Sequence, residues 1–281
     1  MPHRSAAGGR TPPPPVHVPG PGPGRPWRTV RSRLERDGSA VAVATWGEWL
    51  TAALADPALR PLLGHDWQRY RRTRDATARY RFLASRMIVK YTAAAVLGTD
   101  PAALDLAYGI TGRPFIRGFD QIDVSLSHTG DLIAVGVGRT GRIGVDAEPA
   151  GRAVSPELLR RHMCTPAERA ELARMPPDRQ ASELLRLWTL KEAYTKALGQ
   201  GMRLGFTRFG LGLGGGAPAA PDGSPAPLGA WTFTTHLVLD GRYLVSTACQ
   251  DTGLGTARDT TARTMLDREF TSAVEEGLAA R

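Results

Sequence analysis

The 281-residue sequence predicts an α+β protein whose two halves each contain a long helix followed by an antiparallel hairpin. Two hairpin patterns support this prediction, because alternating apolar residues flank turn signals at residues 129–131 and again at Asp240-Gly241. Helical patterns precede each hairpin, over Asp75–Leu97 and Ser182–Leu198, and a glycine follows each of them directly. The same order of elements therefore occurs twice along the chain.

Composition divides the chain into four segments. Residues 1–28 carry a run of prolines and Pro-Gly repeats that cannot bury a core, so we expect this segment to be disordered. An N-terminal α+β half is expected over residues 40–146 and a C-terminal half over residues 147–250, with a tail or helix over residues 251–281. Within the second half, residues 210–229 are rich in Gly, Ala and Pro and predict a mobile loop.

The remaining predicted elements are short and follow from local periodicity and punctuation. The expected helices are Trp46–Ala55, Pro156–Met163 and Pro166–Arg174, and the expected strands are Leu104–Tyr108, Ile122–Ser127, Leu132–Val137, Ile143–Glu148, Trp231–Leu239 and Tyr243–Cys249.

Three carboxylates and two lysines form the strongest chemical pattern. Asp146 and Glu148 alternate with apolar residues, so they share one face of a strand. Glu192 and Lys196 share one stripe of the following helix, and Lys191 precedes them. Carboxylates from a strand and a helix would form the all-oxygen site that Mg²⁺ prefers, and lysines beside it would meet phosphate charge. Each element alone is more typical of a solvated surface, so the prediction rests on their joint occurrence.

A third pattern lies upstream of the carboxylates. Arg113 belongs to a Gly-Arg-Pro sequence, and Ser127-His128 ends a predicted half-buried strand, where a ligand can approach.

With these motifs the chain resembles the Sfp-type 4'-phosphopantetheinyl transferases. That family's pattern is Gly-Lys/Arg-Pro, then Ser-His-Ser/Thr, then Gly-Ile/Val-Asp-X-Glu, then Trp-X-X-Lys-Glu-Ala/Ser-X-X-Lys. All four blocks occur here in that order, and the resemblance covers about residues 60–250. It implies two similar α+β halves, arranged as a pseudo-dimer with the active site in the cleft between them.

The resemblance also implies roles for individual residues. Among the matched positions, Arg81 fits the family's 3'-phosphate arginine better than Arg79 does, although either register is open. Either Glu192 or Glu168 would serve as the base. The implied magnesium ligands are Asp146, Glu148 and Glu192; the implied catalytic residues are Glu192, Lys196, Lys191 and Glu168; the implied coenzyme A contacts are Arg81, Arg113, Ser127 and His128.

The implied reaction moves the 4'-phosphopantetheine arm of coenzyme A to a serine of an acyl or peptidyl carrier protein. It would depend on Mg²⁺, release 3',5'-ADP and serve fatty acid, polyketide or nonribosomal peptide biosynthesis. Two other hypotheses about the function remain. One is an inactive module that binds coenzyme A or a carrier protein, and the other, less favoured by the motif order, is a magnesium-dependent nuclease.

Composition agrees with a cytoplasmic enzyme that binds neither membrane nor nucleic acid, and we expect a monomer. Only Cys164 and Cys249 occur, without the spacing of a disulfide framework or a metal site. No apolar run is long enough to cross a membrane. The net charge of +9 is concentrated in two segments of the sequence. One of them is residues 66–90, which contain seven arginines and one lysine but only two aspartates. Such a basic segment would attract phosphates and an acidic carrier protein.

Overall fold

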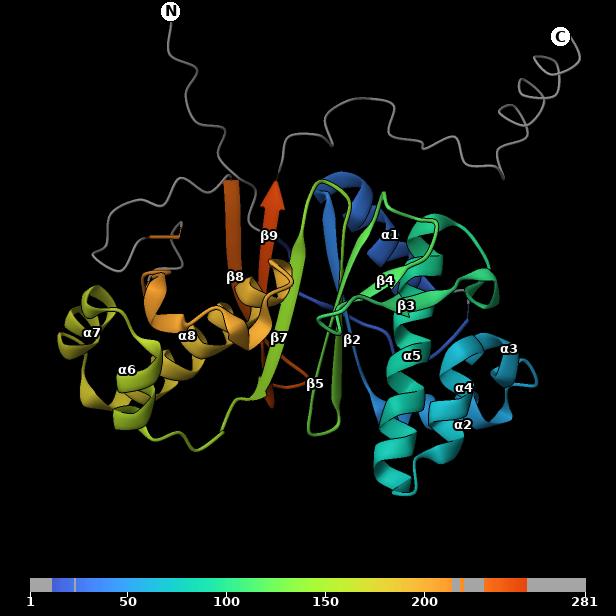
Figure 1. Ribbon diagram of the computed structural model, residues 1–281, viewed down its shortest axis with the longest axis horizontal. Coiled ribbons are helices and arrows are strands. Elements are labelled where there is room, and N and C mark those ends of the chain that lie inside the picture. The colour runs from blue at the N-terminus through green and yellow to red at the C-terminus, as the bar shows by residue number, and fades with distance from the viewer. Residues whose placement is uncertain (1–11, 23, 214–217, 220–229, 252–281) are drawn as a thin grey trace, which may run out of the picture.

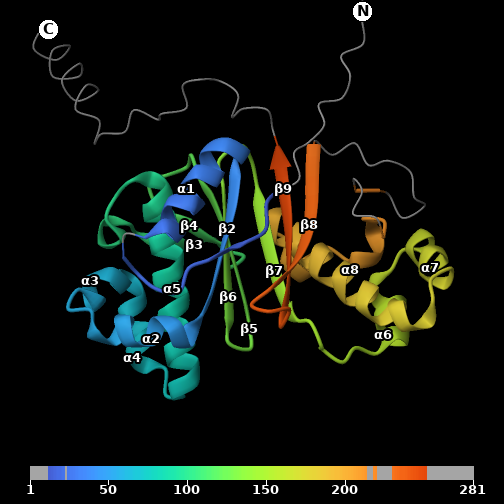
Figure 2. The same cartoon turned by 180° about the vertical axis from the view of Figure 1, so that it is seen from behind.

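The predicted α+β class is confirmed by a computed structural model, which describes residues 12–22, 24–213, 218–219 and 230–251 (Figures 1 and 2). Strands occupy the middle of the molecule and helices flank them on both sides. The strands are β1 Val16–His17, β2 Ser39–Thr45, β3 Leu106–Tyr108, β4 Pro114–Ile116, β5 Asp123–Thr129, β6 Leu132–Gly138, β7 Ile143–Pro149, β8 Ala230–Val238 and β9 Tyr243–Asp251.

Side chains that cap the first backbone N–H groups determine where several of the helices begin. Asp75 accepts from the backbone N–H of Ala78 at the start of α5, and Thr165 with Glu168 forms a capping box at the start of α7. The α-helices are α1 Arg25–Asp37, α2 Trp46–Ala55, α3 Leu59–Leu63, α4 Trp67–Arg72, α5 Ala76–Leu97, α6 Pro156–Met163, α7 Pro166–Ala173 and α8 Pro177–Ala197. Short 3-10 turns cover 64–66, 101–103, 201–203 and 206–208.

The first sheet has the strand order β1-β2-β6-β5, and β5 and β6 form the first predicted hairpin. Its core combines α1, α2 and α5 with the strands, and Trp27, Trp49 and Tyr91 contact one another there. The sequence patterns did not predict α1 or β2. Strand β2 consists of small and branched apolar residues without alternation, because it is buried almost throughout.

The expected disorder of residues 1–28 is wrong for the part of that segment that the structure describes. Strand β1 pairs in parallel with β2, and the N–H of Val18 donates to the carbonyl of Val43 at 2.9 Å. Val18 and Trp27 are buried. Proline-rich composition misled the prediction because an extended chain with alternate apolar side chains can still add to a sheet edge.

The second sheet has the order β7-β9-β8, and β8 and β9 form the second predicted hairpin. Helix α8 packs across this sheet over an apolar core that includes Tyr194, Phe233 and Ala248. It begins at Pro177, five residues before the predicted start at Ser182. Most of the predicted loop 210–229 and the predicted tail after Asp251 lie outside the described residues.

Apolar side chains join the two sheets. Val43 and Leu132 of the first sheet pack against Val145 and Val245 of the second. Side chains of β5 also bond the backbone of β7, since Ser125 Oγ accepts the N–H of Val145 at 3.0 Å. This contact fixes β5 beside β7. Among the described residues, no helix is both long and apolar enough to cross a bilayer.

Candidate active site

Three predicted residues from three elements meet at one point. Ser127 on β5 donates its hydroxyl to Asp146 Oδ1 on β7 at 2.9 Å. Lys196 Nζ on α8 lies 2.7 Å from the same carboxylate oxygen and 3.1 Å from Ser127 Oγ. Asp146 is buried, while the Lys196 side chain keeps 28% exposure. The ammonium group is therefore accessible to a ligand.

Gly144 allows α8 to approach β7 closely enough for this contact. A Cβ atom at this position would lie 1.8 Å from the carbonyl oxygen of Ala193 and 2.6 Å from the nitrogen of Ala197. No side chain can occupy that space. The glycine of the Gly-Val-Asp motif thus brings the helix that carries Glu192 and Lys196 onto the strand that carries Asp146.

Negative charge is crowded around this contact. Burial raises the pKa of Glu192, and the charges of Asp146 and Glu148 raise it further, while Lys196 acts in the opposite direction. Burial also raises the pKa of Glu148, which forms an ion pair with Arg152. The three predicted carboxylates are thus close enough to repel one another.

The carboxylates do not form a ready metal cage in this conformation. Within the described part of the chain, no three acidic, histidine or cysteine side chains converge closely enough to hold a metal ion. Asp146 and Glu148 instead contact Lys196 and Arg152. Their chemistry still suits Mg²⁺, because every donor is a carboxylate oxygen and a divalent cation would relieve their repulsion.

Positive charge gathers beside the carboxylates. Desolvation lowers the pKa of His128, and the charges of Arg81, Lys196 and Arg86 lower it further. Arg81 is among the charges that act on His128, so its side chain lies on this side of the site. An anionic group bound here would meet several cationic side chains at once.

Arg113 ties the elements of the site together. Its guanidinium forms an ion pair with Asp123 and donates to the backbone carbonyls of Ile143, at 2.6 Å, and of Lys196. The predicted phosphate contact is thus already engaged with protein oxygens. A cavity of about 300 Å³ adjoins it. Its lining includes Thr111, Arg113, Ser125, Leu126, Glu192 and Lys196.

Lys191 and Glu168 require a correction. Lys191 is completely buried, and its ammonium donates to Glu168 at 2.7 Å and to the backbone carbonyls of Met163, Phe206 and Phe209. Glu168 also accepts the N–H of Leu211. With these partners the two side chains hold the core of the second half together, and neither is placed to meet a phosphate or a serine.

The motif analysis did not assign roles to Gly144, Asp123 or Arg152. Gly144 opens the Gly-Ile/Val-Asp-X-Glu motif, and Asp123 lies four residues before Ser127 on the same predicted strand, so their spacing to Asp146 and Ser127 was the available signal. Arg152 lies four residues after Glu148, beyond the strand, and no sequence pattern indicated that the two would pair.

Comparison with known proteins supports the motif assignment. Residues 142–248 match the family model of the 4'-phosphopantetheinyl transferase superfamily. The 4'-phosphopantetheinyl transferase of Bacillus subtilis is 28% identical over 134 residues, which are 48% of this chain and 58% of that protein.

Two further relatives have higher identity. The 4'-phosphopantetheinyl transferase HetI of Nostoc is 35% identical, over 44% of this chain and 54% of HetI. The L-aminoadipate-semialdehyde dehydrogenase-phosphopantetheinyl transferase of Eremothecium gossypii is 30% identical, over 61% of this chain and 63% of that protein. The chain thus spans between about half and two thirds of the length of these relatives. The predicted resemblance is confirmed: residues 142–248 match the superfamily model, and the chain is similar to these 4'-phosphopantetheinyl transferases.

Proposed function

We propose that this protein transfers the 4'-phosphopantetheine arm of coenzyme A to a serine of an acyl or peptidyl carrier protein and releases 3',5'-ADP. The observation that supports this best is the contact of Lys196 with Asp146 and Ser127, because it unites three motifs beside an open cavity. The site would lie between two similar halves, residues 40–146 and 147–250. We expect a cytoplasmic monomer.

Charge neutralisation would account for most of the catalysis. Asp146, Glu148 and Glu192 would hold Mg²⁺, which when bound would supply charge neutralisation at the pyrophosphate. Lys196 would leave Asp146 for the departing phosphate. At the other end of the substrate, Arg81, His128, Arg113 and Ser127 would bind the nucleotide and its 3'-phosphate.

The reaction requires one base. The carrier serine oxygen would bond to the phosphorus that bears pantetheine, and the bond from this phosphorus to the bridging oxygen would break, leaving 3',5'-ADP. Glu192 would accept the serine proton, because its carboxylate lines the cavity beside Lys196. Glu168, the other predicted base, is bound to Lys191 inside the core.

Intact mass of carrier proteins tests this proposal. Several apo-carrier proteins would be incubated with the protein, coenzyme A and Mg²⁺, with EDTA and a Ser→Ala carrier as controls. The expected result is a gain of one phosphopantetheine that is absent in both controls. A folded protein that modifies no carrier would contradict the proposal and favour a module that only binds coenzyme A.

A further inference from the structure

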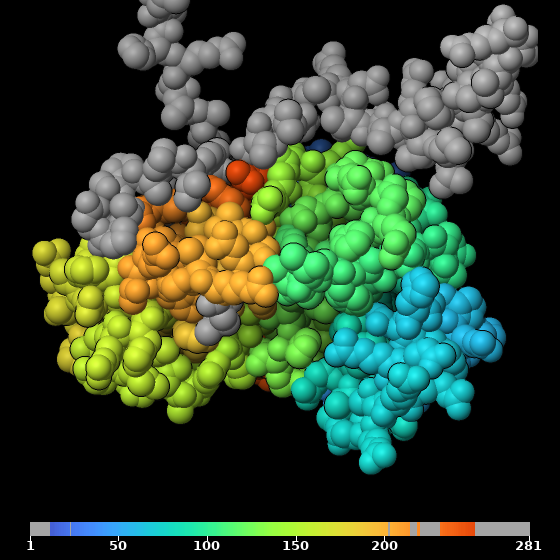
Figure 3. Space-filling model, viewed as in Figure 1, coloured from blue at the N-terminus to red at the C-terminus, as the bar shows by residue number. Residues whose placement is uncertain are grey.

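A groove on the surface of α3 and α4 lies outside the site described above. It consists of two adjoining hollows of about 450 and 410 Å³ that share three residues, Arg60, Trp67 and Gln68. Arg71 and Arg72 line the second hollow. We call this surface, made of these five residues, the α3–α4 groove. Its helices project from the body of the molecule (Figure 3).

The groove carries uncompensated positive charge. Residues 59–74 contain five arginines and a single acidic residue, Asp66. Asp66 is already engaged, because its carboxylate accepts from Arg86 at 2.9 Å and from the Tyr108 hydroxyl at 3.1 Å. In the ranges that the structure describes, no carboxylate lies within ion-pair distance of Arg60, Arg71 or Arg72, and all three are exposed. Such a surface attracts anionic partners.

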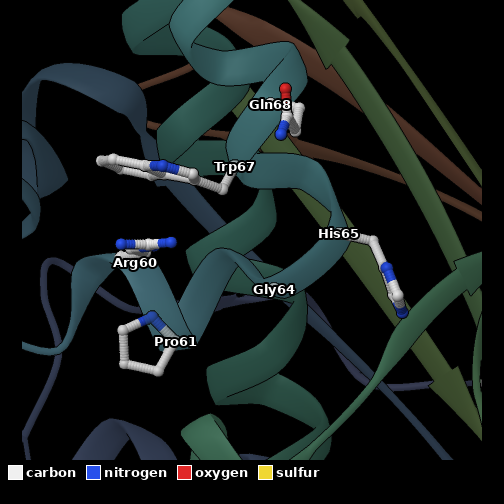
Figure 4. Close-up of a pocket in the computed structure, with 6 residues that line it drawn as sticks. All are labelled: Arg60, Pro61, Gly64, His65, Trp67 and Gln68. Atoms are coloured by element: carbon white, nitrogen blue, oxygen red, sulfur yellow. The ribbon is translucent and has the colours of Figure 1, made fainter.

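An aromatic side chain forms part of the groove. Trp67 is half-buried and stacks on Tyr70 with ring centroids 5.5 Å apart. The guanidinium of Arg60 faces the Trp67 ring, and His65 points away from both (Figure 4). Tryptophan and arginine are the residues most enriched in the energetic centres of protein interfaces. The groove extends over two helices, so it matches a protein surface better than a single phosphate.

One ion pair links α4 to the cationic side of the candidate active site. Asp66, which immediately precedes Trp67, is paired with Arg86, and the charge of Arg86 acts on His128. A partner held on α3 and α4 would therefore lie on the half of the molecule that carries the cationic side of the site. A carrier protein must present its serine there if the proposed function is correct.

We propose that the α3–α4 groove docks an acidic face of the carrier protein, with carboxylates on Arg71 and Arg72 and an apolar side chain against Trp67. This inference rests on the proposed function. Because exposed charges at an interface mainly accelerate encounter, the groove would raise kcat/KM for the carrier and leave the chemical step unchanged. The contribution would weaken as salt is added.

The test reverses the charge of the groove in the full chain. Arg71→Glu together with Arg72→Glu is compared with Arg25→Glu together with Arg28→Glu, an equal change at exposed positions of α1. We expect the groove variant to lower kcat/KM for the carrier roughly tenfold at low salt, with the loss shrinking at high salt. The kcat and the KM for coenzyme A should match those of the α1 variant.

Three results would overturn the inference. These are equal carrier kinetics in the two variants, a raised KM for coenzyme A in the groove variant alone, and a defect independent of salt. Failure of the proposed function is distinguishable, because the wild-type protein would then load no carrier. In that case titration of apo-carrier into the wild-type protein and both variants still decides the inference, since only the groove variant should bind more weakly.

Discussion

The two lysines of one helical motif have different surroundings. Lys191 and Lys196 are five residues apart, which places them about 140° apart around α8. Lys191 is enclosed in the core with Glu168, whereas Lys196 faces β7 and remains partly exposed. Glu192 is four residues before Lys196 and shares its face. Helix geometry thus separates a structural lysine from a candidate catalytic one.

Replacing Lys191 by methionine tests this assignment. The change leaves Glu168 buried without its cation, so we expect the free energy of unfolding to fall by about 3–5 kcal/mol. Urea denaturation followed by circular dichroism would measure it. The comparison is Lys196→Met, which should cost less stability than Lys191→Met because Lys196 is partly exposed, and should abolish transfer. A stable but inactive Lys191→Met protein would instead support a catalytic role.

Titration of His128 tests the cationic side of the site. Burial disfavours the protonated form of His128, and neighbouring positive charge disfavours it further, so His128 should titrate below its ordinary pKa of 6.5. Arg81→Ala should move this pKa upward, as measured from the imidazole proton shifts in NMR spectra. Because folding lowers the pKa of His128, this residue contributes stability to the folded state above pH 6.5. That contribution is lost as the pH falls through the pKa of His128 in the folded protein. An unchanged pKa in Arg81→Ala would place Arg81 away from the site.

At the scale of elements, the packing of α8 on β7 assembles the site. Gly144 permits the close approach, and buried hydroxyls fix it, because Ser246 Oγ lies 2.7 Å from Thr189 Oγ1 on α8 and 2.9 Å from Thr235 Oγ1 on β8. Ser246 is the cross-strand partner of Asp146. The polar contacts therefore adjoin the candidate carboxylates.

Gly144→Ala should disrupt this packing. The added methyl group meets the backbone of α8, so the helix must move, and we expect a loss of at least about 1–3 kcal/mol together with a large loss of transfer activity. Gly151→Ala is the matched control, since a Cβ there meets nothing within 4 Å. Thermal unfolding and carrier loading measure the two effects. Equal behaviour of both variants would show that α8 does not depend on this contact.

Local patterns predicted the long helices and both hairpins well, because these elements alternate or repeat with a clear period. Local patterns did not predict strands that are buried on both faces or that form only by pairing with a strand distant in sequence. Strand β2 has no alternation, and β1 gains its structure only from pairing with β2. The convergence of Ser127, Asp146 and Lys196 followed from motif order, but the burial of Lys191 depended on α7 and the 206–208 turn, which the motif does not contain.

At the scale of the whole molecule, an apolar joint holds the two sheets in a fixed relation. Residues of β2 and β6 pack on residues of β7 and β9, and Arg113 links β5, β7 and the end of α8 by polar contacts. Motifs that are far apart in sequence are thus brought to one place. Residues 12–22 belong to this structure, since β1 extends the first sheet.

Val18→Asp tests whether that segment is part of the folded molecule. Val18 is fully buried beside β2, so an aspartate there should destabilise the protein by at least about 2 kcal/mol. Pro19→Asp adds the same charge at an exposed neighbour and should change stability little. Urea denaturation measures both. Equal stability of the two variants would restore the original expectation of disorder.

The most direct test of the central claim is the rate of phosphopantetheine transfer by Asp146→Asn, measured by intact carrier mass at saturating coenzyme A and Mg²⁺. Asp120→Asn, at an exposed carboxylate outside the site, is the control. The account predicts that Asp146→Asn remains folded and loses at least about 100-fold in rate, while the control keeps the wild-type rate. Equal rates for both variants would show that the contact of Asp146 with Lys196 is not the site of transfer.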